Sequence, residues 1–102
     1  MSIIHTTDQF DEWLDNLKDK RTEKRIKARI RRAEAGNFGD VDSVGDGVYE
    51  MRLHFGPGYR LYYCQRDNEI YWLLIGGAKS TQVNDVERAK EIKNELERSE
   101  AW

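Results

Sequence analysis

Residues 47–82 read GVYEMRLHFGPGYRLYYCQRDNEIYWLLIGGAKSTQ and contain the only proline and the only cysteine of the chain. The Gly56-Pro57-Gly58 segment predicts a chain reversal, because proline fixes φ and glycine adopts backbone conformations closed to other residues. We therefore expect residues 49–55 and 59–65 to pair as an antiparallel hairpin. The run 70–75 is nearly all apolar, which predicts a central strand covered on both faces.

A three-residue loop would fix the register of this hairpin. Side chains alternate between the two faces of a strand, so Met51, Leu53 and Phe55 share one face and are expected to pack in the core. The opposite face would carry three cross-strand pairs: His54 with Arg60, Arg52 with Tyr62, and Glu50 with Cys64. A slip of one residue in the loop would redistribute these pairs.

The N-terminal part of the chain predicts a strand and two helices. Ile3 and Ile4 favour a first strand. Thr7 is expected to cap a helix on which apolar residues recur at helical spacing, namely Phe10, Trp13, Leu14 and Leu17. A second helix is expected from about Thr22 to a C-terminal glycine, Gly36.

Residues 37–46 are rich in glycine and aspartate and predict a loop. After the apolar strand, Asn84 or Asp85 is expected to cap a last helix. The predicted order is β, α, α, β, β, β, α. This is an α+β fold in which two N-terminal helices pack on a small antiparallel sheet, with a C-terminal helix.

The composition indicates one soluble domain spanning residues 1–102. Charged residues make up 35% and hydrophobic residues 38% of the sequence, and no apolar run is long enough to span a membrane. The N-terminus lacks a signal-peptide pattern, so we expect a cytoplasmic protein without membrane contact. Cys64 is expected to be buried, and His5 and His54 add too few ligands for a metal site. We expect no metal and no cofactor.

Basic residues concentrate in one stretch. Residues 21–32 contain seven lysines or arginines and one glutamate. Three interpretations stay open: a solvated helix face, a nucleic-acid phosphate surface, or a docking site for an acidic protein. In the second interpretation the RNA-binding candidates are Arg25, Arg29 and Arg32.

Three segments carry a family resemblance: GVYEMR at 47–52, FGPGYR at 55–60 with the aromatic pair after it, and GGAKSTQ at 76–82. In this order they resemble the RelE/ParE superfamily of bacterial toxins. More narrowly, the chain is similar to the HigB-like, phage-derived "addiction module killer protein" branch. The resemblance covers nearly the whole chain.

The resemblance implies a toxin of a type II toxin–antitoxin pair, neutralised by a cognate antitoxin that in HigB-like branches usually carries a helix-turn-helix domain. RelE and HigB members cleave mRNA in the ribosomal A site without a metal, whereas ParE members poison DNA gyrase. The chain departs from the RelE pattern at Glu50 and Ser80, where that branch commonly has a basic residue and an arginine. It also lacks the tyrosine that the branch carries near Val83 or Asn84.

A metal-free ribonuclease drives the 2′-hydroxyl against the adjacent phosphate, so it must move protons and stabilise the phosphorane. His54 is the candidate proton shuttle. Arg52 and Arg60 are candidate phosphate clamps, with Lys79 adding charge at the end of the next strand. Weaker candidates for RNA contact are Tyr62, by base stacking, and Ser80 and Gln82.

Three functions follow from these observations. The first is a ribosome-dependent mRNA endoribonuclease that arrests translation. The second is a ParE-like toxin that inhibits gyrase through its surface. The third is a non-catalytic member that only binds its antitoxin, in which case the two arginines and His54 are ordinary exposed strand residues.

Overall fold

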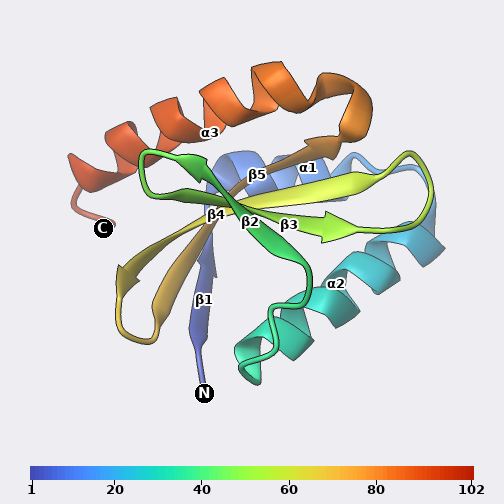
Figure 1. Ribbon diagram of the computed structural model, residues 1–102, viewed down its shortest axis with the longest axis horizontal. Coiled ribbons are helices and arrows are strands. Elements are labelled where there is room, and N and C mark those ends of the chain that lie inside the picture. Colours follow the sequence, from blue (N-terminus) through green and yellow to red (C-terminus); the bar gives the residue numbers. More distant parts are fainter.

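The computed structural model describes residues 1–102 and consists of three helices, five strands and one 3-10 turn (Figure 1). The elements in chain order are β1 (Ile3–Thr6), α1 (Asp8–Asp15), α2 (Lys20–Glu34), β2 (Val41–Gly45), β3 (Val48–Leu53), β4 (Tyr59–Asp67), β5 (Ile70–Ala78), the 3-10 turn η1 (Lys79–Thr81) and α3 (Gln82–Glu97). The α+β class is confirmed. None of the helices has the length and hydrophobicity needed to cross a membrane.

The sheet has the strand order β1-β5-β4-β3-β2. It is mixed, because β1 runs parallel to β5 while all other neighbours are antiparallel. The prediction of an antiparallel sheet is therefore wrong at the β1 edge. The predicted loop at 37–46 is also wrong, since residues 41–45 form β2 and pair with β3. Four residues of this strand are exposed, so hydrogen bonding to β3, and not an apolar pattern, defines it.

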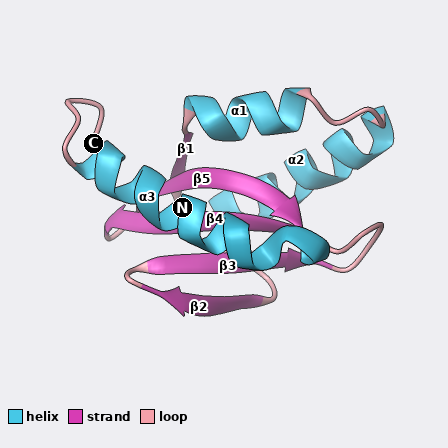
Figure 2. Ribbon diagram, turned by 90° about the horizontal axis from the view of Figure 1, so that it is seen from above, coloured by secondary structure: helices cyan, strands magenta, loops and turns pink.

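The two faces of the sheet support two separate cores. One core joins α1 and α2 to the sheet and contains Phe10, Leu14, Ile26, Ala33, Met51, Leu53, Leu61, Tyr63 and Leu73. The other lies beneath α3 and contains Val48, Tyr62, Cys64, Leu74, Ala89, Ile92 and Leu96. Figure 2 shows α3 lying across the near side of the strands. This three-layer arrangement covers both faces of β5, as the apolar run 70–75 predicted, and it also covers both faces of β4, which was not predicted.

The hairpin between β3 and β4 has a five-residue loop, residues 54–58, and pairs Leu53 with Tyr59 and Arg52 with Arg60. The three predicted polar pairs are wrong, because the register differs by two positions. An even shift keeps every strand residue on its predicted face. His54, however, leaves the strand. The longer loop uses Gly56 at φ 57° and Gly58 at φ 77°, a region that favours glycine.

The helix ends agree with the sequence in part. Thr7 caps α1 as predicted, with its Oγ1 accepting a hydrogen bond from the Phe10 backbone N at 3.0 Å. Asp19 caps α2, which begins two residues before Thr22. The predicted caps of α3 are wrong, because the 3-10 turn runs directly into the helix and leaves both candidate residues inside it.

Two consecutive glycines in β5 let helices approach the sheet from both sides. A Cβ atom on Gly76 would clash with the indole ring of Trp13 in α1. A Cβ atom on Gly77 would clash with the carboxylate of Asp85 in α3. The two glycines of the GGAKSTQ segment are thus required for helix packing at the end of β5, just before Lys79.

Gly76→Ala should destabilise the fold by about 1–3 kcal/mol, because the added methyl group overpacks the indole of Trp13. Urea unfolding would measure this loss. In a Trp13→Leu background the same alanine should cost at least about 1 kcal/mol less, since the clashing ring atoms are gone. Equal costs in the two backgrounds would contradict the proposed contact.

Candidate active site

A hollow of about 540 Å³ lies at the loop end of the β3–β4 hairpin. It is lined by residues 52–60 and Lys79. We call it the hairpin hollow. It brings together the four predicted catalytic residues, Arg52, His54, Arg60 and Lys79, from β3, the hairpin loop, β4 and the turn after β5.

The buried residue beside this hollow is Glu50, whose side chain is 1% exposed. Its Oε1 forms a salt bridge with Arg60 Nη1 at 2.9 Å and accepts a hydrogen bond from Gln82 Nε2 at 2.8 Å, and its Oε2 accepts one from Arg52 Nε at 3.2 Å. The Tyr62 hydroxyl lies 3.5 Å from Oε1. Burial and the Glu50 carboxylate raise the pKa of Tyr62. Glu50 is therefore the shared acceptor for β3, β4 and α3, a role that strand parity did not reveal.

The Arg52 guanidinium contacts three carboxylates, one through each of its nitrogens. Besides Glu50, it contacts Asp40 Oδ1 through Nη1 at 3.2 Å and Asp42 Oδ2 through Nη2 at 3.0 Å. The hydrogen bond to Asp42 raises the pKa of the Arg52 guanidinium. All three nitrogens are thus occupied, which fixes the side chain between β2 and β3 and leaves it little capacity for a phosphate.

His54 forms a pair with Asp40 at the mouth of the hollow. The imidazole Nε2 lies 2.7 Å from Asp40 Oδ2, and the His54 side chain is 73% exposed. The hydrogen bond from His54, followed by the charge of Arg52, lowers the pKa of the Asp40 carboxyl. The sequence did not reveal Asp40 or Asp42, because both reach the site only through the pairing of β2 with β3.

Arg60 and Lys79 keep donors that no protein group uses. The Arg60 side chain is 13% exposed, and its buried Nε has no hydrogen-bond partner. Lys79 is exposed, and the salt bridges of the chain do not include it. A Cβ atom on Gly58 would lie 3.2 Å from the Cβ of Lys79, so the Lys79 side chain begins directly beside the hairpin loop.

The other predicted RNA contacts near this site lie elsewhere. Tyr62 is fully buried under α3, so its ring presents no face to a base in this structure. Gln82 uses its amide to hold Glu50. Ser80 is exposed in η1 but does not line the hairpin hollow.

The three arginines of α2 that are RNA-binding candidates have three different environments. Arg29 is buried and donates to the carbonyls of Arg52 at 2.8 Å and Phe38 at 3.0 Å, which occupies its donors within the protein. Burial, then the charge of Arg32, lowers the pKa of Arg29. Arg25 lies over the Phe55 ring, with Cζ 3.8 Å from the ring centroid. Arg32 is exposed.

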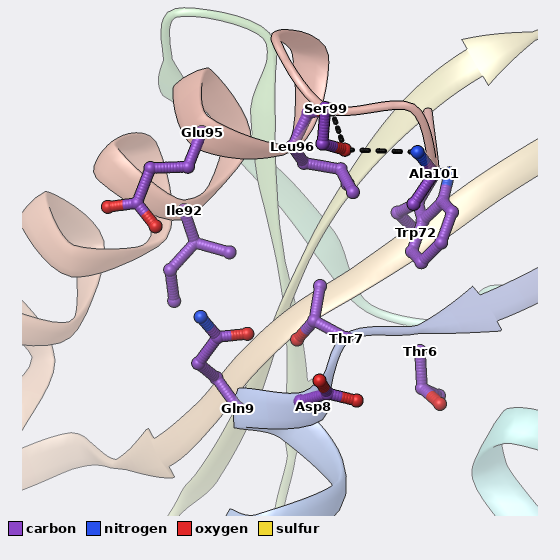
Figure 3. Close-up of a pocket in the computed structure, with 10 residues that line it drawn as sticks. All are labelled: Thr6, Thr7, Asp8, Gln9, Trp72, Ile92, Glu95, Leu96, Ser99 and Ala101. Atoms are coloured by element: carbon purple, nitrogen blue, oxygen red, sulfur yellow. Dashed lines mark hydrogen bonds between the residues drawn. The ribbon is translucent and has the colours of Figure 1, made fainter.

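A different hollow, of about 290 Å³, lies between α1 and the C-terminal part of α3 (Figure 3). Gln9 and Thr7 face it from one side and Ile92 from the other, with Trp72 of β5 at its edge. It contains none of the predicted site residues. Cys64 is buried as predicted, and burial raises the pKa of its thiol to about 11. No group of three histidine, cysteine or acidic side chains is arranged to hold a metal ion.

The chain belongs to the family described as "Phage derived protein Gp49-like (DUF891)", whose model matches residues 12–98. This family lies within the RelE/HigB toxin-like superfamily. The chain is also 47% identical over 93 residues to a Haemophilus influenzae protein described as "Uncharacterized protein", covering 91% of this chain and 94% of that relative. Family membership is compatible with a toxin of a toxin–antitoxin pair.

Glu50→Ala should destabilise the protein by about 3 kcal/mol, because it leaves the largely buried Arg60 guanidinium without its carboxylate. Urea unfolding would measure the change. Glu69→Ala, at an exposed position, is the matched control and should change stability by less than about 0.5 kcal/mol. Similar small losses for both variants would contradict the central role of Glu50.

The Asp40–His54 pair predicts an acid-sensitive contribution to stability. Because the folded-state pKa of Asp40 is lowered, this contribution is complete above the ordinary carboxyl pKa of about 4 and is lost as the pH falls through the lowered value. The unfolding free energy of the wild type should therefore fall more steeply below about pH 4 than that of Asp40→Asn. Parallel pH curves for the two proteins would contradict the pairing.

Proposed function

We propose that this protein is the toxin of a type II toxin–antitoxin pair and cleaves ribosome-bound mRNA without a metal. The observation that carries the proposal is the convergence of Arg52, His54, Arg60 and Lys79 on one hollow, with an Asp40 carboxylate 2.7 Å from the imidazole. Membership of the Gp49-like family supports the toxin role. The HigB-like branch, the ribosome and a helix-turn-helix antitoxin as partners are parts of this proposal.

The proposed general base is the Nδ1 atom of His54. Nε2 faces Asp40. In a neutral imidazole whose Nε2–H forms a hydrogen bond with that carboxylate, Nδ1 is unprotonated and can accept a proton from a ligand in the hollow. Nδ1 takes the proton from the ribose 2′-hydroxyl while the 2′-oxygen bonds to phosphorus. Asp40 holds the ring in this orientation and stabilises the imidazolium that forms.

The negative charge that develops on the phosphorane is stabilised by Arg60 and Lys79, two cations that line the hairpin hollow and are not shared among three carboxylates. The bond from phosphorus to the 5′-oxygen then breaks, and we assign the Lys79 ammonium as the donor of the proton that this oxygen takes up. The products are a 2′,3′-cyclic phosphate and a 5′-hydroxyl end. Arg52 acts as a positioning residue, because its guanidinium is shared among three carboxylates.

His54→Ala should lower the rate of mRNA cleavage on ribosomes by about 100-fold or more, the range of a lost general base. It should also abolish growth arrest when the protein is expressed in bacteria. Primer extension on ribosome-bound mRNA measures the cleavage. His54 is exposed, so the variant should remain folded and lose only the small contribution of its contact with Asp40, which thermal unfolding would show.

The matched control is His5→Ala, which removes the other histidine, in β1 and outside the hairpin hollow. It should cleave and arrest growth as the wild type does. A His54→Ala variant that cleaves normally would overturn the proposed chemistry. Growth arrest by the wild type with intact mRNA and inhibited gyrase supercoiling would support the ParE-like alternative. Antitoxin binding without any arrest would support the non-catalytic one.

A further inference from the structure

A second hollow adjoins the hairpin hollow on the side of α2. It has a volume of about 320 Å³ and is lined by Arg25, Ala28, Arg29, Arg32, Leu53, His54 and Phe55. We call it the α2 hollow. Three of its residues, Leu53, His54 and Phe55, also line the hairpin hollow. The two hollows therefore meet at the candidate catalytic histidine.

The α2 hollow has an unbalanced charge. Its lining contains three guanidinium groups and one imidazole but no carboxylate. The only acidic residue within 21–32, Glu23, contacts Lys20 and Lys27 and none of these arginines. In the hairpin hollow, Glu50 pairs with Arg52 and Arg60, whereas no carboxylate forms an ion pair with the three arginines of the α2 hollow. Asp40 pairs with His54, which lines both hollows. The α2 hollow therefore attracts an anion.

Two of the three guanidiniums are available to an anion. Arg29 donates its hydrogen bonds to backbone carbonyls, so it contributes positive charge to the hollow but no free donor. Arg25 is held against the Phe55 ring, which fixes a planar fork of donors without an ion pair and lowers the entropy lost on binding. The Arg32 residue is exposed, and its side chain forms no hydrogen bond or ion pair within the protein.

We propose that the α2 hollow binds the phosphodiester adjacent to the scissile one in a single-stranded RNA, with Arg25 and Arg32 as its ligands. This inference rests on the proposed function, because it takes the hairpin hollow as the place of cleavage. Planar guanidiniums match the paired oxygens of a phosphate. An RNA strand whose reacting phosphate lies beside His54 would carry its next phosphate across Phe55 into the α2 hollow.

The test measures RNA binding separately from cleavage. A fluorescein-labelled 2′-O-methyl RNA, which lacks the attacking hydroxyl, would be titrated with wild type, Arg25→Gln/Arg32→Gln and the matched control Lys24→Gln/Arg31→Gln at several salt concentrations. The control removes the same charge from exposed residues of α2 that line neither hollow. Arg32→Gln alone serves as a second variant, because it leaves the Arg25–Phe55 contact intact.

The Arg25→Gln/Arg32→Gln variant should bind at least about 10-fold more weakly at low salt. Its plot of log affinity against log salt should lose about 1.4 in slope, the value for two phosphate contacts on a single strand. The control should lose less than about 3-fold, and Arg32→Gln should show about half of the slope change. Equal losses in the two double variants, or no RNA binding by the wild type, would overturn the site.

Two further outcomes separate this inference from the proposed function. If the wild type binds RNA through Arg25 and Arg32 but cuts no ribosome-bound mRNA, the phosphate site stands and the nuclease proposal fails. If the double variant binds RNA normally but no longer binds an acidic antitoxin peptide, the α2 hollow is a protein-docking site and the inference fails.

Discussion

A buried carboxylate organises the part of this protein that carries its candidate chemistry. Glu50 lies in β3 with 1% of its side chain exposed, forms a salt bridge with Arg60 of β4, and accepts hydrogen bonds from Arg52 of its own strand and Gln82 of α3. A buried charge is tolerated only when it is paired and hydrogen-bonded. These partners must therefore keep their positions, which fixes the hairpin relative to the start of the last helix.

The cationic residues fall into two groups: those held by groups of the protein itself, and those with donors left for a ligand. Arg52 is bound by Glu50, Asp40 and Asp42, and Arg29 ties α2 to β3 and to the segment before β2. The donors that remain for a ligand belong to Lys79, to part of Arg60, and to the arginines on the outer side of α2. The RelE branch commonly has a basic residue at the position of Glu50. The acidic residue of this chain thus has a structural explanation.

The sequence predicted the elements that follow an apolar pattern. The alternation in 47–65 sorted the hairpin side chains correctly onto two faces, and the spacing of Phe10 and Leu14 placed α1 on the sheet. It failed where geometry is decided by contacts distant in sequence. The length of the loop at 54–58 could not be read from Gly56 to Gly58, and β2 has no apolar pattern, because it is an edge strand held by backbone pairing. Asp40 was missed for this reason.

Burial within a basic helix or a polar strand face was equally hidden. Arg29 looks like its neighbours in the sequence, yet it is buried against carbonyls, whereas Arg32 is exposed. Tyr62 shares the strand face of Arg52 and Arg60, but α3 covers it completely. In both cases the burial of a side chain depends on a second segment that packs against it. The sequence around the side chain does not show which segment that is.

The central claim is that, in the hairpin hollow, the ribose 2′-oxygen of a bound RNA attacks the adjacent phosphate. Its most direct test is a ribosome-bound mRNA with a single 2′-deoxynucleotide at the mapped cleavage position, compared with the all-ribose mRNA. The expected result is a 2′,3′-cyclic phosphate end from the all-ribose mRNA and no cut at the deoxy position. Cleavage at the deoxy position, or no cleavage of either mRNA, would contradict the account.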